Sequence, residues 1–289
     1  MHATPDRFLG IEGRYADYAA ARYAILPVPY EGTVSYAPGT ADGPRAVIEA
    51  SKQVEWFDEE LLAEFYQAGV ATLAPVPPAS DVEEQMARVA AAARRPIDDG
   101  KFLLALGGEH SITPPIVRQI ARRHGDISVL QLDAHADLRD SYVGGGKCSH
   151  ASAMRRVLEI TPRIAQVGIR NFSLEEYQSC PEQAKRFITP AVVESDPRWI
   201  DRVLGLLGEK VYLTLDIDGF DSSEAPGTGT PEPGGLSWRQ VIAMLRRVCS
   251  ERQVVGADIV EVRPLPPSNV TEFLAARLAY KIIAYTQAR

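Results

Sequence analysis

Three short apolar runs in this chain of 289 residues each lead into a cluster of carboxylates and imidazoles. Together the clusters hold six potential metal ligands, namely His110, Asp133, His135, Asp137, Asp216 and Asp218. Donors of these types are enough to bind two divalent cations through shared carboxylates and to leave room for a water that the cations make reactive. The sequence therefore predicts a binuclear metal-dependent hydrolase.

The polar residues lie where a parallel sheet would bring them together. Four strand-like runs deliver them: 102–106 leads to His110, 127–132 to Asp133, 211–215 to Asp216, and 254–262 carries Glu261. In open parallel sheets, ligands bind beyond the carboxyl ends of the strands. We therefore expect all four segments to place their polar residues at the same sheet edge.

The spacing within each cluster also fits a shared site. Alternate residues of an extended chain point to the same side, so Asp216 and Asp218 can address one metal cluster together. Asp133 and His135 can do the same, and Asp137 joins them if the backbone stays extended. The pair Gly107-Gly108 permits a sharp exit from the sheet that swings His110 inward.

The wider pattern predicts an α/β fold. Strand candidates cover residues 24–28, 102–106, 127–132, 164–168, 211–215 and 254–262. Helix candidates between and after them cover residues 82–95, 116–123, 197–207, 238–249 and 271–286. Strands rich in Val, Ile and Leu that alternate with helices are typical of a parallel sheet covered on both faces. No linker divides the chain, so we expect one domain over residues 1–289.

Long irregular stretches separate several of these elements, at residues 29–44, 139–146, 221–235 and 264–268. Loops of that length in a compact domain are usually functional. Three of the four adjoin predicted site residues.

The composition argues against a membrane protein, a nucleic-acid-binding protein and a disulfide-rich protein. The chain is 45% hydrophobic and 24% charged, as is ordinary for a globular protein, and no apolar run reaches the roughly 18 residues that span a bilayer. Its first seven residues lack the order of a signal peptide, so we expect a cytoplasmic location. A net charge of −7 argues against a nucleic-acid or anionic-membrane partner. Three dispersed cysteines predict neither a disulfide framework nor a thiolate metal site.

Several motifs together resemble the ureohydrolase (arginase/agmatinase) family over nearly the whole chain. The matching segments are Gly107-Gly108-Glu109-His110-Ser111, Asp133-Ala134-His135-Ala136-Asp137, Ser149-His150-Ala151-Ser152, Asp216-Ile217-Asp218-Gly219-Phe220-Asp221, Pro226-Gly227-Thr228-Gly229-Thr230-Pro231 and Ile259-Val260-Glu261-Val262. The resemblance implies a three-layer α/β/α fold around a mostly parallel sheet, and hydrolysis of a guanidinium to urea and an amine.

The resemblance also implies two Mn²⁺ ions and their ligands. One ion is held by His110, Asp133, Asp137 and Asp216, and the other by Asp133, His135, Asp216 and Asp218. Asp133 and Asp216 then bridge the two ions. Carboxylate oxygens dominate the set and no thiolate occurs, which favours Mn²⁺ while leaving Zn²⁺, Co²⁺, Ni²⁺ or Fe²⁺ open.

Three further residues are expected to act on the substrate. Glu261 can pair with the guanidinium and aim its carbon at the attacking water. Asp137 can orient that water and carry a proton to the leaving nitrogen, while His150 would pass a proton to the departing amine. Thr230 lies in a segment that resembles the family's substrate-side loop, and we expect it to contact substrate.

Structural alternatives for these residues stay open. Glu261 could instead pair with Arg263, His150 could cap the following helix, and residues 226–231 could form a rigid turn without contact to substrate.

The sequence favours agmatine as the substrate, which would give putrescine and urea. Arginases carry an Asn where this chain has Arg139, and they usually follow the shuttle histidine with Gly where this chain has Ala151. Glu109 replaces the Asp that is more usual before His110, and it keeps a carboxylate there. Guanidinobutyrate, aminopropylagmatine and arginine remain alternative substrates.

Two other classes of protein could have a metal site of this kind. A metal-dependent amide deacetylase typically uses one Zn²⁺ and a tandem His-His pair, which the sequence lacks. A silent metal-binding scaffold would have lost a ligand, and none is missing. Members of the family commonly form trimers or hexamers, so we expect a homo-oligomer.

Overall fold

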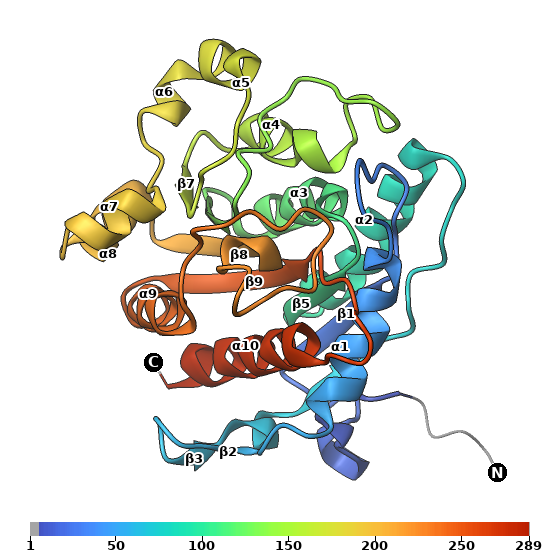
Figure 1. Cartoon of the computed structure of the whole chain (residues 1–289). Coiled ribbons are helices and arrows are strands. Elements are labelled where there is room, and N and C mark those ends of the chain that lie inside the picture. The colour runs from blue at the N-terminus through green and yellow to red at the C-terminus, as the bar shows by residue number, and fades with distance from the viewer. Residues whose placement is uncertain (1–5, 289) are drawn as a thin grey trace.

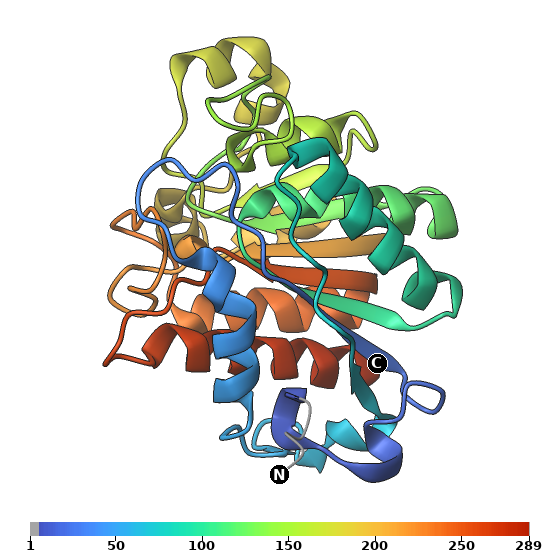
Figure 2. The ribbon, with the colours of Figure 1, turned by 90° about the vertical axis from the view of Figure 1, so that its right-hand side faces the viewer.

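A parallel sheet between two layers of helices forms the frame of the computed structural model, which describes residues 6–288 (Figures 1 and 2). The strands are β1 (Tyr23–Val28), β2 (Phe57–Asp58), β3 (Ala63–Glu64), β4 (Val70–Thr72), β5 (Phe102–Gly107), β6 (Ser128–Leu132), β7 (Ile164–Val167), β8 (Lys210–Asp216) and β9 (Gln253–Val260). The helices are α1 (Gly43–Ser51), α2 (Val82–Asp98), α3 (Thr113–His124), α4 (Ala153–Leu158), α5 (Leu174–Ser179), α6 (Pro181–Ala184), α7 (Pro190–Ser195), α8 (Trp199–Leu206), α9 (Trp238–Glu251) and α10 (Val270–Gln287).

Seven strands make up the main sheet, in the order β4-β1-β5-β9-β8-β6-β7. Every neighbouring pair in it is parallel. Parallel strands are buried on both faces, which explains why their sequences are almost continuously apolar. The predicted α/β fold, with helices on both faces of a parallel sheet, is confirmed.

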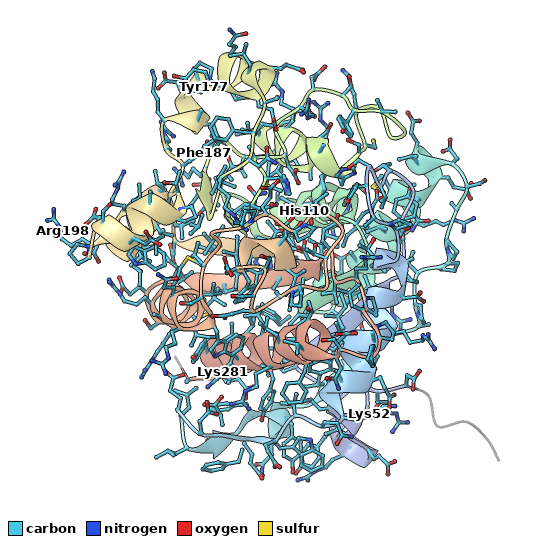
Figure 3. The ribbon with its side chains drawn as sticks, in the orientation of Figure 1. Lys52, His110, Tyr177, Phe187, Arg198 and Lys281 are labelled. Atoms are coloured by element: carbon cyan, nitrogen blue, oxygen red, sulfur yellow. The ribbon has the colours of Figure 1, made fainter. Side chains whose placement is uncertain are left out.

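Two hydrophobic cores hold the layers together, one on each face of the sheet. Helices α1, α8, α9 and α10 cover one face, and α2, α3 and α4 cover the other (Figures 1 and 2). Each fully buried Leu, Ile or Val side chain contributes about 1.5–3 kcal/mol, so both faces of the sheet are strongly held. Figure 3 marks His110, which follows β5, and Lys281 on α10.

Most predicted elements are found within two or three residues of their expected bounds. Helix α1 was not expected, because its first residues, Gly43 and Pro44, fall in a stretch assigned to a loop. Proline suits the first turn of a helix, where its missing N–H has no partner to lose. The short hairpin of β2 and β3 was also missed, since two-residue strands have no periodicity to read.

None of the helices within residues 6–288 is both long and apolar enough to cross a lipid bilayer. The stretch that argued against a signal peptide lies mostly outside the described residues. The three cysteines in the described part of the chain form no disulfide with one another.

Candidate metal centre and active site

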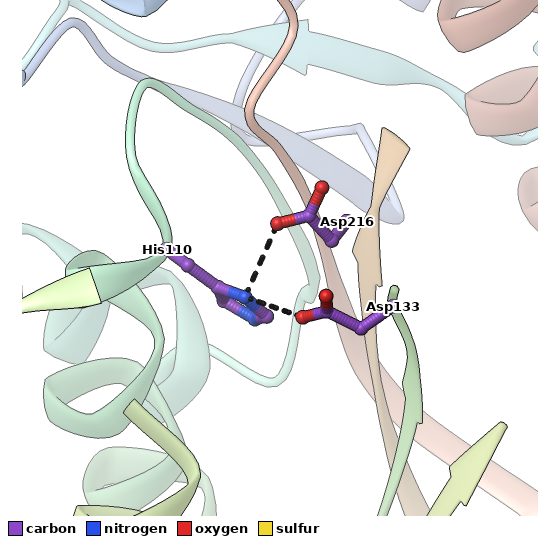
Figure 4. Close-up of side chains that lie close together, drawn as sticks. All are labelled: His110, Asp133 and Asp216. Carbon is purple, nitrogen blue, oxygen red and sulfur yellow. Dashed lines mark ion pairs between the residues drawn. The ribbon is translucent and has the colours of Figure 1, made fainter. Parts of the chain in front are cut away.

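Adjacent strands of the sheet deliver the predicted site residues to one edge. β5, β9, β8 and β6 are consecutive neighbours, and their carboxyl ends lead to His110, Glu261, Asp216 and Asp133 respectively. Figure 4 shows the ring of His110 facing the carboxylates of Asp133 and Asp216. The expectation that these segments meet at a single edge is confirmed.

One imidazole nitrogen is surrounded by three carboxylates. Nδ1 of His110 lies 3.1 Å from Asp133 Oδ2, 3.0 Å from Asp137 Oδ2 and 3.4 Å from Asp216 Oδ2. All four side chains are buried. The oxygens and the nitrogen thus converge on one small, buried volume.

The tautomer of His110 follows from its other neighbours. Nε2 lies 2.8 Å from the hydroxyl of Thr214, and that hydroxyl donates its only hydrogen to Asp258 Oδ1 at 2.7 Å. Nε2 must therefore carry the ring hydrogen and donate it to Thr214. Nδ1 is therefore the nitrogen that faces the carboxylates and that a metal would bind, and it is buried with no hydrogen-bond partner among residues 6–288. A buried nitrogen left in this state is what a metal ligand requires.

A second cluster shares a carboxylate with the first. Nδ1 of His135 lies 3.0 Å from Asp218 Oδ2 and 3.6 Å from Asp133 Oδ1. The candidate ligand atoms of His110, Asp133 and Asp216 all lie within 4.8 Å of one another, as do those of Asp133, His135 and Asp218. Asp133 belongs to both groups, which fits a carboxylate shared between two cations.

The backbone reaches this arrangement differently from the prediction. Asp137 has a φ of 52°, and Asp218 lies in the 3₁₀ turn Ile217–Gly219, so neither continues an extended strand. Asp216 closes that turn, because its Oδ1 accepts a hydrogen bond from the N–H of Asp218 at 2.9 Å. The expectation of extended backbone at Asp137 and Asp218 is wrong, although their carboxylates still reach the site.

Gly108 serves close approach rather than an unusual turn. Its φ is not positive, and a Cβ placed on it would lie 2.0 Å from the carbonyl oxygen of Tyr30. The chain after β5 can pass so near the loop after β1 only without a side chain at this position.

The charges of the two clusters do not balance. Burial, followed by the charge of Asp133, raises the pKa of Asp137 to about 7. Burial and the neighbouring carboxylates raise the pKa of Asp216 well above its usual range. Although burial opposes it, the imidazoles of His110 and His135 hold the pKa of Asp133 below its usual range. Oxygen-rich buried donors with too little positive charge fit two divalent cations, and the donor set suits the group that the sequence predicted.

Glu261 follows β9 and presents one free oxygen to the site. Its Oε1 accepts a hydrogen bond from the N–H of His110 at 2.8 Å, and its own N–H donates to the carbonyl of Gly108 at 2.7 Å. Its φ of 63° turns the chain out of the strand. Oε2 forms no hydrogen bond to a described residue. Arg263 donates instead to the carbonyl of Pro38, so the alternative of a Glu261–Arg263 pair is not realised.

His150 begins the 3₁₀ turn His150–Ser152 and lines the same cavity. Its Nδ1 lies 3.0 Å from the hydroxyl of Thr33. Burial, with the positive charges of His110 and His135, lowers the pKa of His150 to about 4. Its imidazole is therefore neutral near pH 7.

The cavity over these residues has a volume of about 470 Å³. Its wall includes Thr230, whose hydroxyl lies 3.4 Å from Asp218 Oδ2. The wall also carries one basic side chain, Arg139, and a larger set of aromatic and acidic ones, namely Tyr36, Tyr142, Phe172, Glu176, Glu232 and Glu261. An aromatic and acidic wall suits a cationic ligand.

The residues predicted from the sequence line the site, but three side chains that hold them in place were not predicted. Thr214, Asp258 and Thr33 were not predicted, although a charged residue within the apolar run of β9 was a signal for Asp258. Thr33 carried no signal, because its role depends on the meeting of two loops far apart in sequence.

Comparisons with known proteins identify the family of this chain. The model of the arginase family matches residues 21–284. An N(1)-aminopropylagmatine ureohydrolase of Synechocystis sp. is 39% identical, over 97% of this chain and 94% of its own. An agmatinase of Bacillus anthracis is 32% identical over 87% of each chain. The crystal structure of agmatine ureohydrolase of Thermoplasma volcanium superposes with a TM-score of 0.87 at 32% identity, covering 98% of this chain and 95% of that one. This chain therefore belongs to the arginase family and is an agmatinase-like ureohydrolase.

Proposed function

We propose that this chain hydrolyses the guanidinium of agmatine to urea and putrescine with two Mn²⁺ ions. One ion would be held by His110, Asp133, Asp137 and Asp216, and the other by Asp133, His135, Asp216 and Asp218. The observation that carries the proposal is the free Oε2 of Glu261, which shares a cavity with the buried cluster around Nδ1 of His110. An unpaired carboxylate oxygen beside a site for cations is suited to hold a guanidinium next to reactive water.

The side chains divide the work of the reaction between them. When bound, the two cations lower the pKa of water and so supply a nucleophile near neutral pH. Glu261 pairs with the guanidinium and fixes the position of its carbon. Asp137 accepts a hydrogen bond from the attacking water and carries a proton to the leaving nitrogen. His150 exchanges a proton with the departing amine, and Thr230 contacts the substrate.

The part of the substrate beyond the guanidinium distinguishes the candidate substrates from one another. The wall carries more acidic side chains, such as Glu232, than basic ones, of which Arg139 is one, and this excess of negative charge supports an amine tail over the carboxylate tail of guanidinobutyrate. Aminopropylagmatine is a second candidate, because the relative at 39% identity carries that substrate in its name. Its extra ammonium would lie against the same acidic wall. Both candidates place the protein in polyamine synthesis.

Urea release from a panel of guanidines tests the proposal directly. The purified chain with added Mn²⁺ is assayed against agmatine, aminopropylagmatine, guanidinobutyrate and arginine. We expect the highest kcat/KM for agmatine, with aminopropylagmatine next. Arginine as the best substrate would overturn the assignment. Metal analysis should find about two ions per chain, and a single tightly bound zinc would contradict the binuclear site.

We propose further that residues 1–289 act as one ureohydrolase domain in the cytoplasm and assemble as a homo-oligomer, a trimer or a hexamer. Light scattering coupled to size exclusion measures the assembly, and a monomer at micromolar concentration would refute it.

A further inference from the structure

Thr33 joins two loops that are distant in sequence. It lies in the long segment between β1 and α1, it is buried, and its hydroxyl contacts both Glu109 and His150. The hydroxyl donates to Glu109 Oε1 at 2.7 Å. It accepts the backbone N–H of His150 at 3.1 Å and lies 3.0 Å from Nδ1 of the same residue. One hydroxyl thus holds both the backbone and the ring of His150.

The number of donors around Glu109 determines the direction of each hydrogen bond made by the Thr33 hydroxyl. Glu109 receives four donors, which are the N–H groups of Gly32 and Thr33 and the hydroxyls of Thr33 and Ser111. A carboxylate with all four positions occupied accepts only, so the single hydrogen of the Thr33 hydroxyl points to Glu109. The Thr33 oxygen is then an acceptor toward His150, and Nδ1 must carry the ring hydrogen.

The packing leaves the imidazole little freedom. A Cβ on Gly145 would lie 2.3 Å from Cγ2 of Thr33, so the loop that carries His150 closes directly onto the Thr33 methyl group. The ring of Tyr142 meets the ring of His150 edge to face, with centroids 5.7 Å apart. Nε2 forms no hydrogen bond to any described residue, and His150 lines the cavity. The free nitrogen of the ring is therefore the one available to a ligand.

We propose that Thr33 and Glu109 are positioning residues that hold His150 as the Nδ1–H tautomer, with the Nε2 lone pair available to the cavity. Nε2 takes up one proton from the solvent that enters the cavity while Nδ1–H stays bonded to Thr33. The same proton then passes from Nε2 to the departing amine, and the neutral ring is restored. This direction of transfer rests on the proposed function, whereas the tautomer itself does not.

The tautomer can be read by ¹⁵N NMR of histidine-labelled protein loaded with diamagnetic Zn²⁺. The variant His150→Asn identifies the signal, because it removes one of five histidines. We expect the wild-type ring to be protonated at Nδ1 and bare at Nε2. A wild-type ring protonated at Nε2 would overturn the proposal, whatever substrate the enzyme prefers.

Two variants of Thr33 separate the hydroxyl from the methyl group. Thr33→Val keeps the shape and loses the hydroxyl, and Thr33→Ser keeps the hydroxyl and loses the methyl. We expect Thr33→Val to lose the fixed tautomer and to lower kcat by about 10–100-fold, as supporting hydrogen bonds of this kind do. KM and metal content should stay near the wild-type values, and Thr33→Ser should retain the tautomer. An unchanged tautomer and kcat in Thr33→Val would refute the proposal.

The variant Glu109→Gln tests the direction of the hydrogen bond between the Thr33 hydroxyl and Nδ1 of His150. The backbone N–H groups of Gly32 and Thr33 require an oxygen at the Oε2 position, so the amide nitrogen must face the Thr33 hydroxyl. The amide then donates to Thr33, whose hydroxyl is freed to donate to Nδ1. We expect the ring hydrogen to move to Nε2 in this variant, and retention of Nδ1–H with normal metal content would contradict the proposal. If the wild-type protein releases urea from no guanidine, the proposed function fails while the tautomer result stands.

Discussion

The hydroxyl of Thr214 lies 2.8 Å from Nε2 of His110, and this contact decides which nitrogen of the ring faces the carboxylate cluster. Asp258 completes the support by accepting the Thr214 hydroxyl at 2.7 Å. The same logic recurs at His150, where a threonine hydroxyl is polarised by a buried carboxylate. In both cases the threonine hydroxyl donates its hydrogen to a carboxylate and therefore accepts a hydrogen bond from one ring nitrogen of the histidine. Only the other ring nitrogen can then bind a metal or exchange a proton.

Replacement of Thr214 should weaken metal binding. In Thr214→Val, His110 loses the acceptor that holds its Nε2–H, and the ring is no longer fixed in the orientation that binds metal. We expect Mn²⁺ affinity to fall by about 10–100-fold, the usual effect of removing such a support. Isothermal titration of Mn²⁺ into metal-free protein measures it. Thr214→Ser retains the hydroxyl and is the matched control, and equal affinity in both variants would contradict the role of Thr214.

Loss of the charge on Glu261 should impair the reaction and leave the fold intact. Glu261→Gln keeps the oxygen that accepts the N–H of His110, but it removes the negative charge beside the guanidinium. Truncating one partner of a buried charge pair costs about 2–5 kcal/mol, so we expect kcat/KM to fall by about 30-fold or more. Steady-state urea release measures the loss. Metal content and Tm should be unchanged, and a variant as active as wild type would remove Glu261 from the site.

The strands that deliver the site residues could be predicted from the sequence, but the turns and the threonine contacts that orient these residues could not. Apolar runs that lead into His110, Asp133, Asp216 and Glu261 were sufficient to place four strands in one sheet, because parallel strands all present the same end. The turns at Asp137 and Asp218 were not predicted, because alternate polar residues after a strand fit extended backbone as well as they fit the left-handed residue and the 3₁₀ turn that the structure has. Thr33 was not predicted because its contacts join two loops that are far apart in the sequence.

Lys281 anchors the hairpin of β2 and β3 to α10 on the side of the sheet covered by the C-terminal helix. Its side chain is 2% exposed, and Nζ lies 2.9 Å from Asp58 Oδ2 and 3.2 Å from Glu60 Oε2. Lys281→Met should leave the buried carboxylate of Asp58 without a counter-charge, although Glu60 keeps its ion pair with Arg246, and should destabilise the fold by about 3–5 kcal/mol. Urea unfolding measures the change. Lys185→Met removes an exposed ion pair and should have no measurable effect, and equal stability of the two variants would contradict this role of Lys281.

The metal site should make the stability of the metal-free protein depend on pH in a defined direction. Burial raises the pKa of Asp137 to about 7, and burial together with neighbouring carboxylates raises that of Asp216 and Glu261 well above their usual range. Although burial opposes it, the surrounding carboxylates raise the pKa of His110 well above its usual range. Each of these groups keeps its proton in the folded chain at a pH where the unfolded chain has lost it.

Stability of the metal-free chain should therefore fall as the pH rises from about 5 to 8, because the folded state binds more protons than the unfolded state across that range. Asp137 alone can contribute up to about 3 kcal/mol of this change, since its share is lost over the roughly two pH units between pH 5 and its folded pKa, and one pH unit is worth about 1.4 kcal/mol. Calorimetry of chelator-treated protein should show Tm falling with pH, while Mn²⁺ should flatten the dependence because cations replace the protons. Asp137→Asn removes one titrating group and should reduce the slope. A metal-free protein that grows more stable over this range would show that these carboxylates are not forced together by the fold.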